Sequence, residues 1–150
     1  MVSKRKTRQK PPARFVLDCS VVFAWFFADE ANSYADAVAE SLLQTTAIVP
    51  SLWTLEVANT LIVGERRRRS TQAQADTFLS RLTRLPIMVD DETAQQAWSA
   101  TLDLARQHVL SSYDACYLEL ALRKNAPLAT LDENLKKVAT KIGVSLYKGQ

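Results

Sequence analysis

The sequence has few of the residues that mark disordered, fibrous or membrane-spanning chains. It contains 3 glycines and 5 prolines among 150 residues, while 47% of its residues are hydrophobic and are spread along the chain. This composition argues against disorder beyond the first dozen residues and predicts one folded domain. The longest uncharged apolar run covers residues 21–28. Because a bilayer span needs about 20 apolar residues, we expect no transmembrane helix.

Cysteine and histidine are also scarce. Cys19 and Cys116 form no CxxC pair, and two cysteines alone make neither a disulfide framework nor a zinc site. We expect two buried thiols in a reducing compartment, and therefore a cytoplasmic protein. His108 is the single histidine, which excludes a mechanism that needs two. No nucleophile-elbow motif supports a catalytic triad around it.

Acidic residues are absent from residues 1–14, which carry six basic ones. The whole chain has 19 basic and 16 acidic residues, so residues 15–150 carry 13 basic against 16 acidic residues, a net charge of −3. We predict that residues 1–14 are a basic, flexible N-terminal tail and that residues 15–150 are a single domain. The tail is either an arm that attracts polyanions or a processing remnant without a role.

Short apolar segments alternate with longer amphipathic ones along the rest of the chain. We expect strands at residues 15–17, 47–49, 87–89, 127–131 and 144–146, and helices at residues 21–28, 33–44, 51–69, 71–84, 92–108, 111–124 and 133–141. This alternation is typical of a parallel sheet covered on both faces. The predicted class is α/β, a three-layer α/β/α sandwich with a mainly parallel central sheet. Ligands bind such sheets beyond the carboxyl ends of the strands, where the strand order reverses.

Two acidic residues directly follow predicted strands. Asp18 comes after the apolar residues 15–17, and Asp132 comes after residues 128–131. Both are therefore expected at the edge of the sheet where ligands bind. Each has a second interpretation, because Asp18 can cap the next helix and Thr130 with Glu133 matches a capping box. Ser20 can cap the helix equally well, which favours a functional role for Asp18.

Two further acids are expected on the buried faces of helices. Glu56 lies among Leu52, Leu55, Asn59 and Val63, on the stripe that we expect to face the core. An ionised carboxylate there needs a cation, hydrogen bonds or protonation. The alternative is a glutamate at the edge of the stripe that reaches solvent through its flexible stem.

Asp114 begins the apolar stripe that continues through Tyr117, Leu118 and Ala121, but with Ser111 it also matches a capping box. Together, Asp18, Glu56, Asp114 and Asp132 converge on one end of the predicted sheet. Clustered carboxylates repel one another, and a hard divalent cation such as Mg²⁺ or Mn²⁺ relieves that repulsion. Such an ion neutralises phosphate charge and acidifies bound water. The chemistry that we predict is phosphodiester hydrolysis.

Four segments resemble the PIN-domain family, and most closely the VapC-type toxin ribonucleases of toxin–antitoxin pairs. They are FVLDCSVVFAWF from Phe15, PSLWTLEVANTL from Pro50, LSSYDACYL from Leu110 and ATLDENL from Ala129. The resemblance spans residues 15–147. Two departures are a longer basic tail than these toxins usually carry and a cysteine at position 19, where a small or hydroxylated residue is usual.

The resemblance implies an endoribonuclease that requires Mg²⁺, with Mn²⁺ as a substitute. It implies a metal site of Asp18, Glu56, Asp114 and Asp132, with Ser20, Asn59 and Thr130 as supporting hydrogen-bonding residues. It also implies an RNA substrate, a homodimer and a small antitoxin that plugs the groove. Two rival interpretations remain: a catalytically inactive PIN-like fold that binds protein or RNA, and an aspartyl-phosphate phosphotransferase. An aspartyl-phosphate phosphotransferase would require another aspartate at position 20, which is a serine in this chain.

Two other groups of residues have open roles. Arg66, Arg67, Arg68 and Arg69 are candidate contacts to the RNA backbone, although a solvated helix end that complements the helix dipole explains them equally well. We expect Trp25, Trp53 and Trp98 to lie on apolar helical faces in the core rather than to stack on bases.

Overall fold

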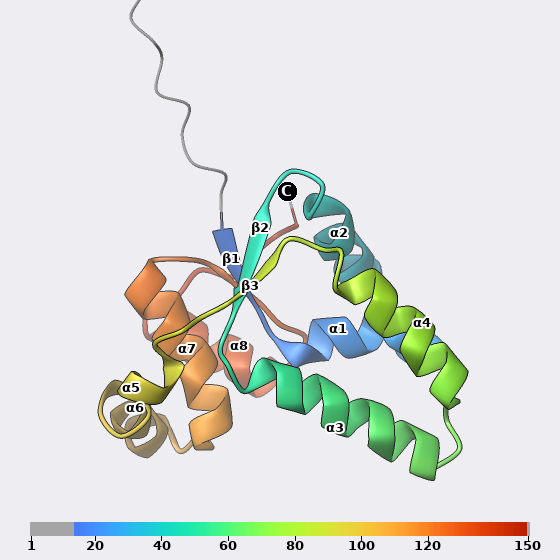
Figure 1. Ribbon diagram of the computed structural model, residues 1–150. Coiled ribbons are helices and arrows are strands. Elements are labelled where there is room, and N and C mark those ends of the chain that lie inside the picture. The colour runs from blue at the N-terminus through green and yellow to red at the C-terminus, as the bar shows by residue number, and fades with distance from the viewer. Residues whose placement is uncertain (1–13, 150) are drawn as a thin grey trace, which may run out of the picture.

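Figure 1 shows a computed structural model of the chain, in which residues 14–149 are described. The strands are β1 (Arg14–Leu17), β2 (Thr46–Val49), β3 (Ile87–Val89) and β4 (Leu128–Ala129). The helices are α1 (Cys19–Phe26), the 3-10 helix η1 (Ala28–Glu30), α2 (Ser33–Ser41), α3 (Trp53–Arg66), α4 (Gln72–Leu82), α5 (Thr93–Gln96), α6 (Ala100–His108), α7 (Ser112–Lys124) and α8 (Glu133–Lys141). The predicted tail, residues 1–14, lies outside the described residues except for Arg14.

The central sheet has the order β3-β2-β1-β4, and all of its pairings are parallel. In Figure 1, helices α1 to α4 lie on one side of the strands and α5 to α7 on the other, which confirms the predicted α/β class. The chain leaves β1 toward β2 on one side, whereas β4 pairs with the other side of β1. The strand order therefore reverses at β1 and β4, and a ligand site is expected beyond their carboxyl ends.

The three residues at the end of β1 are fully buried, because strands in the middle of a parallel sheet are covered on both faces. α7 packs against β1 and β4, while α1 packs against α2 and α3. None of the described helices is long and apolar enough to cross a membrane.

Side-chain caps begin several of the helices. Asn32 accepts hydrogen bonds from two amides at the start of α2, Thr71 and Gln74 form a reciprocal capping box at α4, and Ser111 and Asp132 cap α7 and α8. Each cap satisfies an amide that has no partner inside its helix. These short-range signals explain why the helix starts agree with the sequence to within about two residues.

Three predicted elements differ from the structure. The strand expected at residues 127–131 is only β4 (Leu128–Ala129), so Thr130 rather than Asp132 directly follows it. The helix expected at residues 92–108 is broken into α5 and α6, because Ser99 leaves the helical region with φ −118° and ψ −101°. This break places Trp98 in solvent, 92% exposed, so its assignment to the core is wrong. The strand expected at residues 144–146 is reduced to one bridge, between Leu128 and Leu146, because β4 offers only two residues for pairing.

The buried face of α3 also differs from the predicted one. It consists of Trp53, Val57, Leu61 and Gly64. The expected stripe is rotated to the other side, where Leu55 is 74% exposed and where Asn59 and Ile62 are exposed as well. Counted at 3.6 residues per turn, Glu56 flanks the buried face. Glu56 therefore lies at the edge of the buried face and is half-buried rather than fully exposed.

Candidate metal centre

The carboxylate of Asp18 lies at the carboxyl end of β1 and is 7% exposed. Its Oδ2 accepts hydrogen bonds from Ser20 Oγ and Thr130 Oγ1, both at 2.7 Å. Thr130 directly follows β4, so these contacts link the ends of the two strands at which the order reverses. Ser20 Oγ also accepts the Leu131 amide at 2.9 Å. Among the described residues no side chain donates to Oδ1, which leaves that oxygen as the better placed ligand atom.

Asp132 is the N-cap of α8, so the capping box expected between Thr130 and Glu133 is not formed. Its Oδ1 accepts the Leu135 amide at 2.8 Å and so caps α8. Its own amide donates to Thr130 Oγ1 at 3.1 Å. The side chain is exposed, yet its negative charge contributes to raising the pKa of Asp18. Asp132 is therefore a helix cap at the rim of the cluster.

Asp114 reaches the same region from the first turn of α7. Its amide donates to Ser111 Oγ at 3.0 Å, which is one half of the capping box that the sequence suggested. Burial raises the pKa of the Asp114 carboxyl, and the charges of Asp18 and Asp132 raise it further. These interactions mean that carboxylates from residues 18, 114 and 132 lie close enough to repel one another.

Glu56 completes the cluster from the first turn of α3, and a tyrosine holds it. Tyr117 is fully buried, and its hydroxyl donates a hydrogen bond to Glu56 Oε1 at 2.7 Å. The Cys19 sulfur lies 3.3 Å from the same hydroxyl. Burial raises the pKa of Glu56, the Tyr117 hydrogen bond lowers it, and the charges of Asp18 and Asp114 raise it again.

Sequence reasoning placed Tyr117 in the core and missed this contact. A signal was present, since Tyr117 lies one turn after Asp114 on the buried stripe of α7. A buried tyrosine hydroxyl needs a hydrogen-bond partner. Its partner, however, lies 61 residues away in the chain, and no local pattern identifies it.

The cluster contains negative charge that no basic residue in the described part of the chain neutralises. No ion pair of the described residues involves Asp18, Glu56, Asp114 or Asp132. Burial is the largest cause of the raised pKa at three of them. Hard oxygen donors with unneutralised charge fit Mg²⁺ or Mn²⁺, which would stabilise the ionised carboxylates. The four acids are spread more widely than a closed triad, because the one group of three metal-ligating side chains within 4.8 Å among residues 14–149 lies elsewhere.

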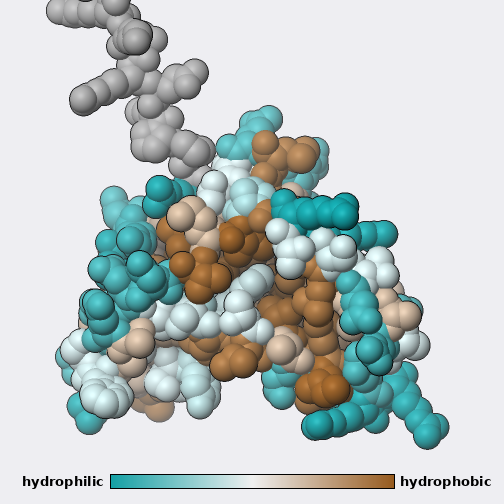
Figure 2. Space-filling model, viewed as in Figure 1, coloured by the Kyte–Doolittle hydropathy of each residue, from teal (hydrophilic) through white to brown (hydrophobic). Residues whose placement is uncertain are grey.

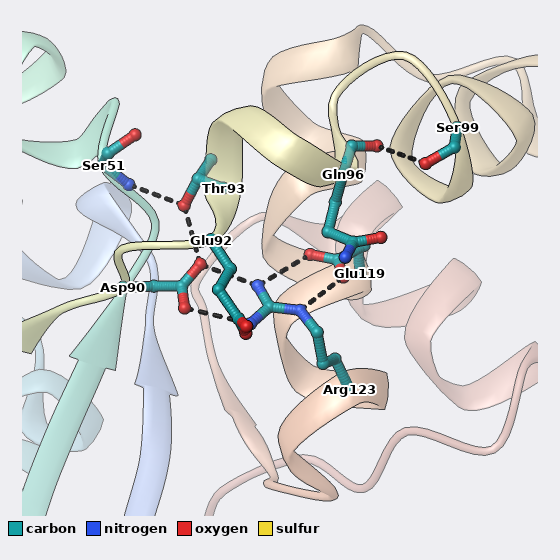
Figure 3. A network of polar contacts seen from close by, with 8 residues as sticks. All are labelled: Ser51, Asp90, Glu92, Thr93, Gln96, Ser99, Glu119 and Arg123. Atoms are coloured by element: carbon teal, nitrogen blue, oxygen red, sulfur yellow. Dashed lines mark hydrogen bonds and ion pairs between the residues drawn. The ribbon is translucent and has the colours of Figure 1, made fainter.

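That other group is Asp90, Asp91 and Glu92, which follow β3. Figure 3 shows that a guanidinium already fills the place of a cation there. Arg123 lies 2.7 Å from Asp90, 2.8 Å from Glu92 and 2.7 Å from Glu119. Hydrogen bonds from Arg123 hold the pKa of Asp90 below its usual range. We therefore assign Asp90 and Glu92 to a structural network rather than to a metal site.

The same network reaches the loop before α3. Thr93 donates to Asp90 Oδ2 at 2.9 Å and accepts the Ser51 amide at 3.0 Å (Figure 3). Residues of α7, of the segment after β3 and of the α3 entry are thus joined. The helices that carry Asp114 and Glu56 are the two that this network connects.

The remaining predicted site residues lie apart from the cluster. Asn59 is on the exposed side of α3, and its side chain makes no hydrogen bond with a described residue. Arg66, Arg67 and Arg68 are exposed at the end of α3. Arg69 is engaged by acidic residues, at 3.1 Å from Asp29 and 3.6 Å from Glu30, and its guanidinium stacks 4.0 Å over the Phe27 ring.

Comparison with known proteins gives consistent results. The family model described as PIN domain matches residues 15–141. Similar solved structures include PAE2754 from Pyrobaculum aerophilum (TM-score 0.63, 19% identity, 92% of this chain and 88% of that chain). They also include VapBC2 from Rickettsia felis bound to a DNA fragment from their promoter (TM-score 0.61, 16% identity, 89% of this chain and 97% of that chain). A third is FitAcB from Neisseria gonorrhoeae (TM-score 0.59, 15% identity, 90% of this chain and 97% of that chain). No curated protein sequence matches the chain.

Proposed function

Because the chain belongs to the PIN domain family, we propose that it is a divalent-metal-dependent endoribonuclease and the toxin of a type II toxin–antitoxin pair. The observation that carries the proposal is the Asp18 carboxylate, which is 7% exposed and has no basic partner among the described residues. Burial raises the pKa of Glu56 and of Asp114, and the neighbouring carboxylate charges raise both further. A bound cation would stabilise the ionised form of such a group.

The residues of the chain have separable roles in this reaction. Asp18, Glu56, Asp114 and Asp132 would hold Mg²⁺ or Mn²⁺, which when bound supplies charge to the scissile phosphate and acidifies a water molecule. Ser20 and Thr130 orient Asp18 by donating to Oδ2, which leaves Oδ1 available to an ion. An aspartyl-phosphate enzyme requires a second aspartate at the position of Ser20, so this alternative is disfavoured.

The direct test is cleavage of RNA by the purified chain and by Asp18→Asn, with Mg²⁺, with Mn²⁺ and in EDTA. We expect more than about a 100-fold loss of rate in Asp18→Asn, because loss of a metal ligand should cost more than loss of a supporting residue. Asp91→Asn is the matched control, since Asp91 is an exposed acid outside the cluster. Equal rates for Asp18→Asn, or full activity in EDTA, would refute the proposal.

The toxin assignment draws on the similarity to VapBC2 and FitAcB. We expect that expression of the chain without its antitoxin arrests growth and that Asp114→Asn relieves the arrest. The cytoplasm is the compartment we propose, because it contains the RNA substrate and because Cys19 and Cys116 are free buried thiols. If Asp114→Asn arrests growth as strongly as the wild type, toxicity does not depend on the metal site and the prediction is contradicted.

We also propose a homodimer, supported by exposed apolar side chains. The α3–α4–β3 face comprises Leu55, Ile62, Leu79, Met88 and Val89, which are 37–74% exposed. Figure 2 shows hydrophobic surface gathered where these three elements meet. A cleft of about 210 Å³ between them is lined mainly by apolar residues, Trp53 and Ile87 among them. An exposed apolar patch rimmed by polar residues is typical of an interface.

A further inference from the structure

Helix α3, which carries Glu56, begins without a side-chain cap of its own. Other helices, such as α7 and α8, begin at a residue whose side chain accepts one of their first free amides. The backbone just before α3 is held instead by a distant part of the chain, because the Ser51 amide donates a hydrogen bond to Thr93 Oγ1 at 3.0 Å. Thr93 is the first residue of α5, 42 positions further along. The entry of α3 is therefore fixed from outside the helix.

The Thr93 hydroxyl is oriented by a carboxylate. It has a single hydrogen, which it donates to Asp90 Oδ2 at 2.9 Å, and this leaves its lone pairs for the Ser51 amide (Figure 3). Arg123 in turn donates to Asp90 Oδ1 at 3.0 Å and to Oδ2 at 2.7 Å. Such a contact at two points defines the orientation of a carboxylate as well as its position. Thr93 is thus bound to a group that is itself held in one orientation.

This chain of contacts begins on the helix that carries Asp114. Arg123 lies in the last turn of α7, and Asp114 lies in the first turn. A helix of regular geometry passes the position of one end on to the other. The contacts from Arg123 through the Asp90 carboxylate and the Thr93 hydroxyl therefore relate the position of Asp114 to the entry of α3.

The separation of α3 and α7 depends on side-chain links of this kind. α3 packs mainly on α1, whereas α7 packs on α5, α6 and β1. One link is the hydrogen bond from Tyr117 to Glu56, and the contacts through Thr93 form a second one. A single link leaves α3 free to tilt about it, while two links restrict the tilt. Because metal–ligand distances must fit within about 0.2 Å, a small tilt of α3 would move Glu56 away from an ion held by Asp114.

The contribution of the Thr93 hydroxyl to the stability of the fold is small. Thr93 is half-buried and Ser51 is exposed, so water can accept the Ser51 amide when the hydroxyl is absent. The buried charges keep their partners, because Arg123 still contacts Asp90 and Glu119. An effect of Thr93 on metal binding is therefore separable from an effect on folding.

We propose that Thr93 is a positioning residue of the metal centre, whose hydroxyl holds the entry of α3 so that Glu56 and Asp114 reach the same ion. The inference rests on the proposed function and adds to it a residue outside the carboxylate cluster. Within residues 14–149, the hydrogen bonds of the Thr93 hydroxyl go to Ser51 and Asp90. Thr93 therefore acts on the ion only through the backbone of α3.

The test is the affinity of the full chain for Mn²⁺ alone, measured by electron paramagnetic resonance, which detects the free ion. We expect Thr93→Val to bind Mn²⁺ about 10- to 100-fold more weakly, the effect typical of residues that support metal ligands. Thr93→Ser keeps the hydroxyl and should bind like the wild type. Thr45→Val is the matched control, because Thr45 is also half-buried and its hydroxyl donates to the Ser41 carbonyl at 2.8 Å, before β2. Asp18→Asn identifies the binding that belongs to the carboxylate cluster.

Two further measurements separate a positioning role from a structural one. In EDTA, the Tm of Thr93→Val should be close to that of Thr45→Val, because each variant loses one half-buried hydroxyl. In RNA cleavage, Thr93→Val should need more Mg²⁺ for half of its maximal rate, while its KM for RNA stays unchanged. A general loss of stability does not produce this combination.

The outcomes distinguish this inference from the proposed function. Wild-type chain that does not bind Mn²⁺, or Asp18→Asn that binds it as tightly as the wild type, would overturn both. Binding that depends on Asp18 and that Thr93→Val leaves unchanged would overturn the positioning role alone. A Thr93→Ser variant as weak as Thr93→Val would do the same, because the hydroxyl would then not be the cause. Equal losses of affinity in Thr93→Val and Thr45→Val would assign the effect to destabilisation and would also overturn the positioning role.

Discussion

At the scale of single residues, the chain keeps carboxylates in surroundings that oppose their ionisation. Asp18 is the most buried of them, and its two hydroxyl donors only partly offset the effect of burial on its pKa. This arrangement costs stability when no cation is bound, since an ionised group with an unfavourable environment destabilises the folded state. The cost is measurable by removing the charge or the hydrogen bonds.

The raised pKa of Asp18 predicts how stability depends on pH without metal. Because the folded-state pKa lies above the unfolded value of 3.8, the contribution of this group is fully present below pH 3.8 and is lost as the pH rises through the raised folded value. Asp18→Asn keeps a side-chain oxygen that can accept the hydrogen bonds from Ser20 and Thr130, but it cannot ionise and so does not lose stability as the pH rises. In EDTA we therefore expect Asp18→Asn to melt at least about 2 °C above the wild type at pH 8. The difference should vanish in acid, and parallel Tm profiles would contradict it.

The hydrogen bond from Tyr117 to Glu56 predicts how the rate of RNA cleavage depends on pH. Tyr117→Phe removes the hydrogen bond that lowers the pKa of Glu56, so the pKa of Glu56 should rise. We expect cleavage at neutral pH to slow by about 10- to 100-fold, as for other residues that orient a metal ligand. Because ionised Glu56 then requires higher pH, part of the rate should return in alkaline buffer. The measurement is the pH–rate profile.

Tyr34→Phe is the matched control for this profile. The Tyr34 hydroxyl donates to the Tyr147 carbonyl at 2.6 Å, away from the cluster, and is also partly buried. Removal of the Tyr34 hydroxyl should lower the stability of the fold and leave the shape of the pH–rate profile unchanged. If both variants shift the profile equally, a general loss of stability explains the effect.

At the scale of elements, two connections determine how the helices that carry the site are held. Arg123 of α7 binds acids that follow β3, and the strained Val109 joins α6 to α7. The two features act in opposite directions. The ion-pair network stabilises the arrangement of α7 on the sheet, whereas the left-handed valine opposes it.

Arg123→Met is expected to destabilise the protein strongly. It leaves Asp90 and Glu119, whose side chains are 2% and 5% exposed, without their cation. Breaking one partner of a buried pair costs about 3–5 kcal/mol, which corresponds to roughly 6–20 °C in Tm. The control is Lys136→Met, which breaks the exposed pair with Glu133 and should cost less than about 1 kcal/mol. Similar urea midpoints for the two variants would contradict the role of the network.

The left-handed backbone at Val109 predicts a stabilising substitution. Glycine adopts this conformation without steric cost, so Val109→Gly should stabilise the chain by about 1 kcal/mol, or about 2–4 °C in Tm. Asn125 has nearly the same conformation at the end of α7, with φ 48° and ψ 48°, and asparagine tolerates it. The reverse change, Asn125→Val, should therefore destabilise. A lower Tm for Val109→Gly would show that the valine side chain makes a compensating contact.

At the scale of the whole molecule, the α3–α4–β3 face predicts an oligomer. β3 is an edge strand whose residues Met88 and Val89 are 52% and 50% exposed. We expect a dimer in sedimentation velocity, and we expect Met88→Glu to shift it to monomer because a buried unpaired charge is unfavourable. Leu43→Glu is the control, since Leu43 is 85% exposed at the end of α2. A monomeric wild type, or a dimer that Met88→Glu leaves intact, would exclude this face.

The sequence by itself determined the features that depend on near neighbours. The apolar run followed by Asp18 located the end of β1, and capping residues located the helix starts, because these interactions span at most a few residues. The α/β class follows from the order of such elements. Only the tertiary structure decided which face of α3 is buried, that Trp98 is exposed, and that Arg123 neutralises Asp90. It also decided that Tyr117 holds Glu56 across 61 residues, because such contacts arise when distant helices pack on one sheet.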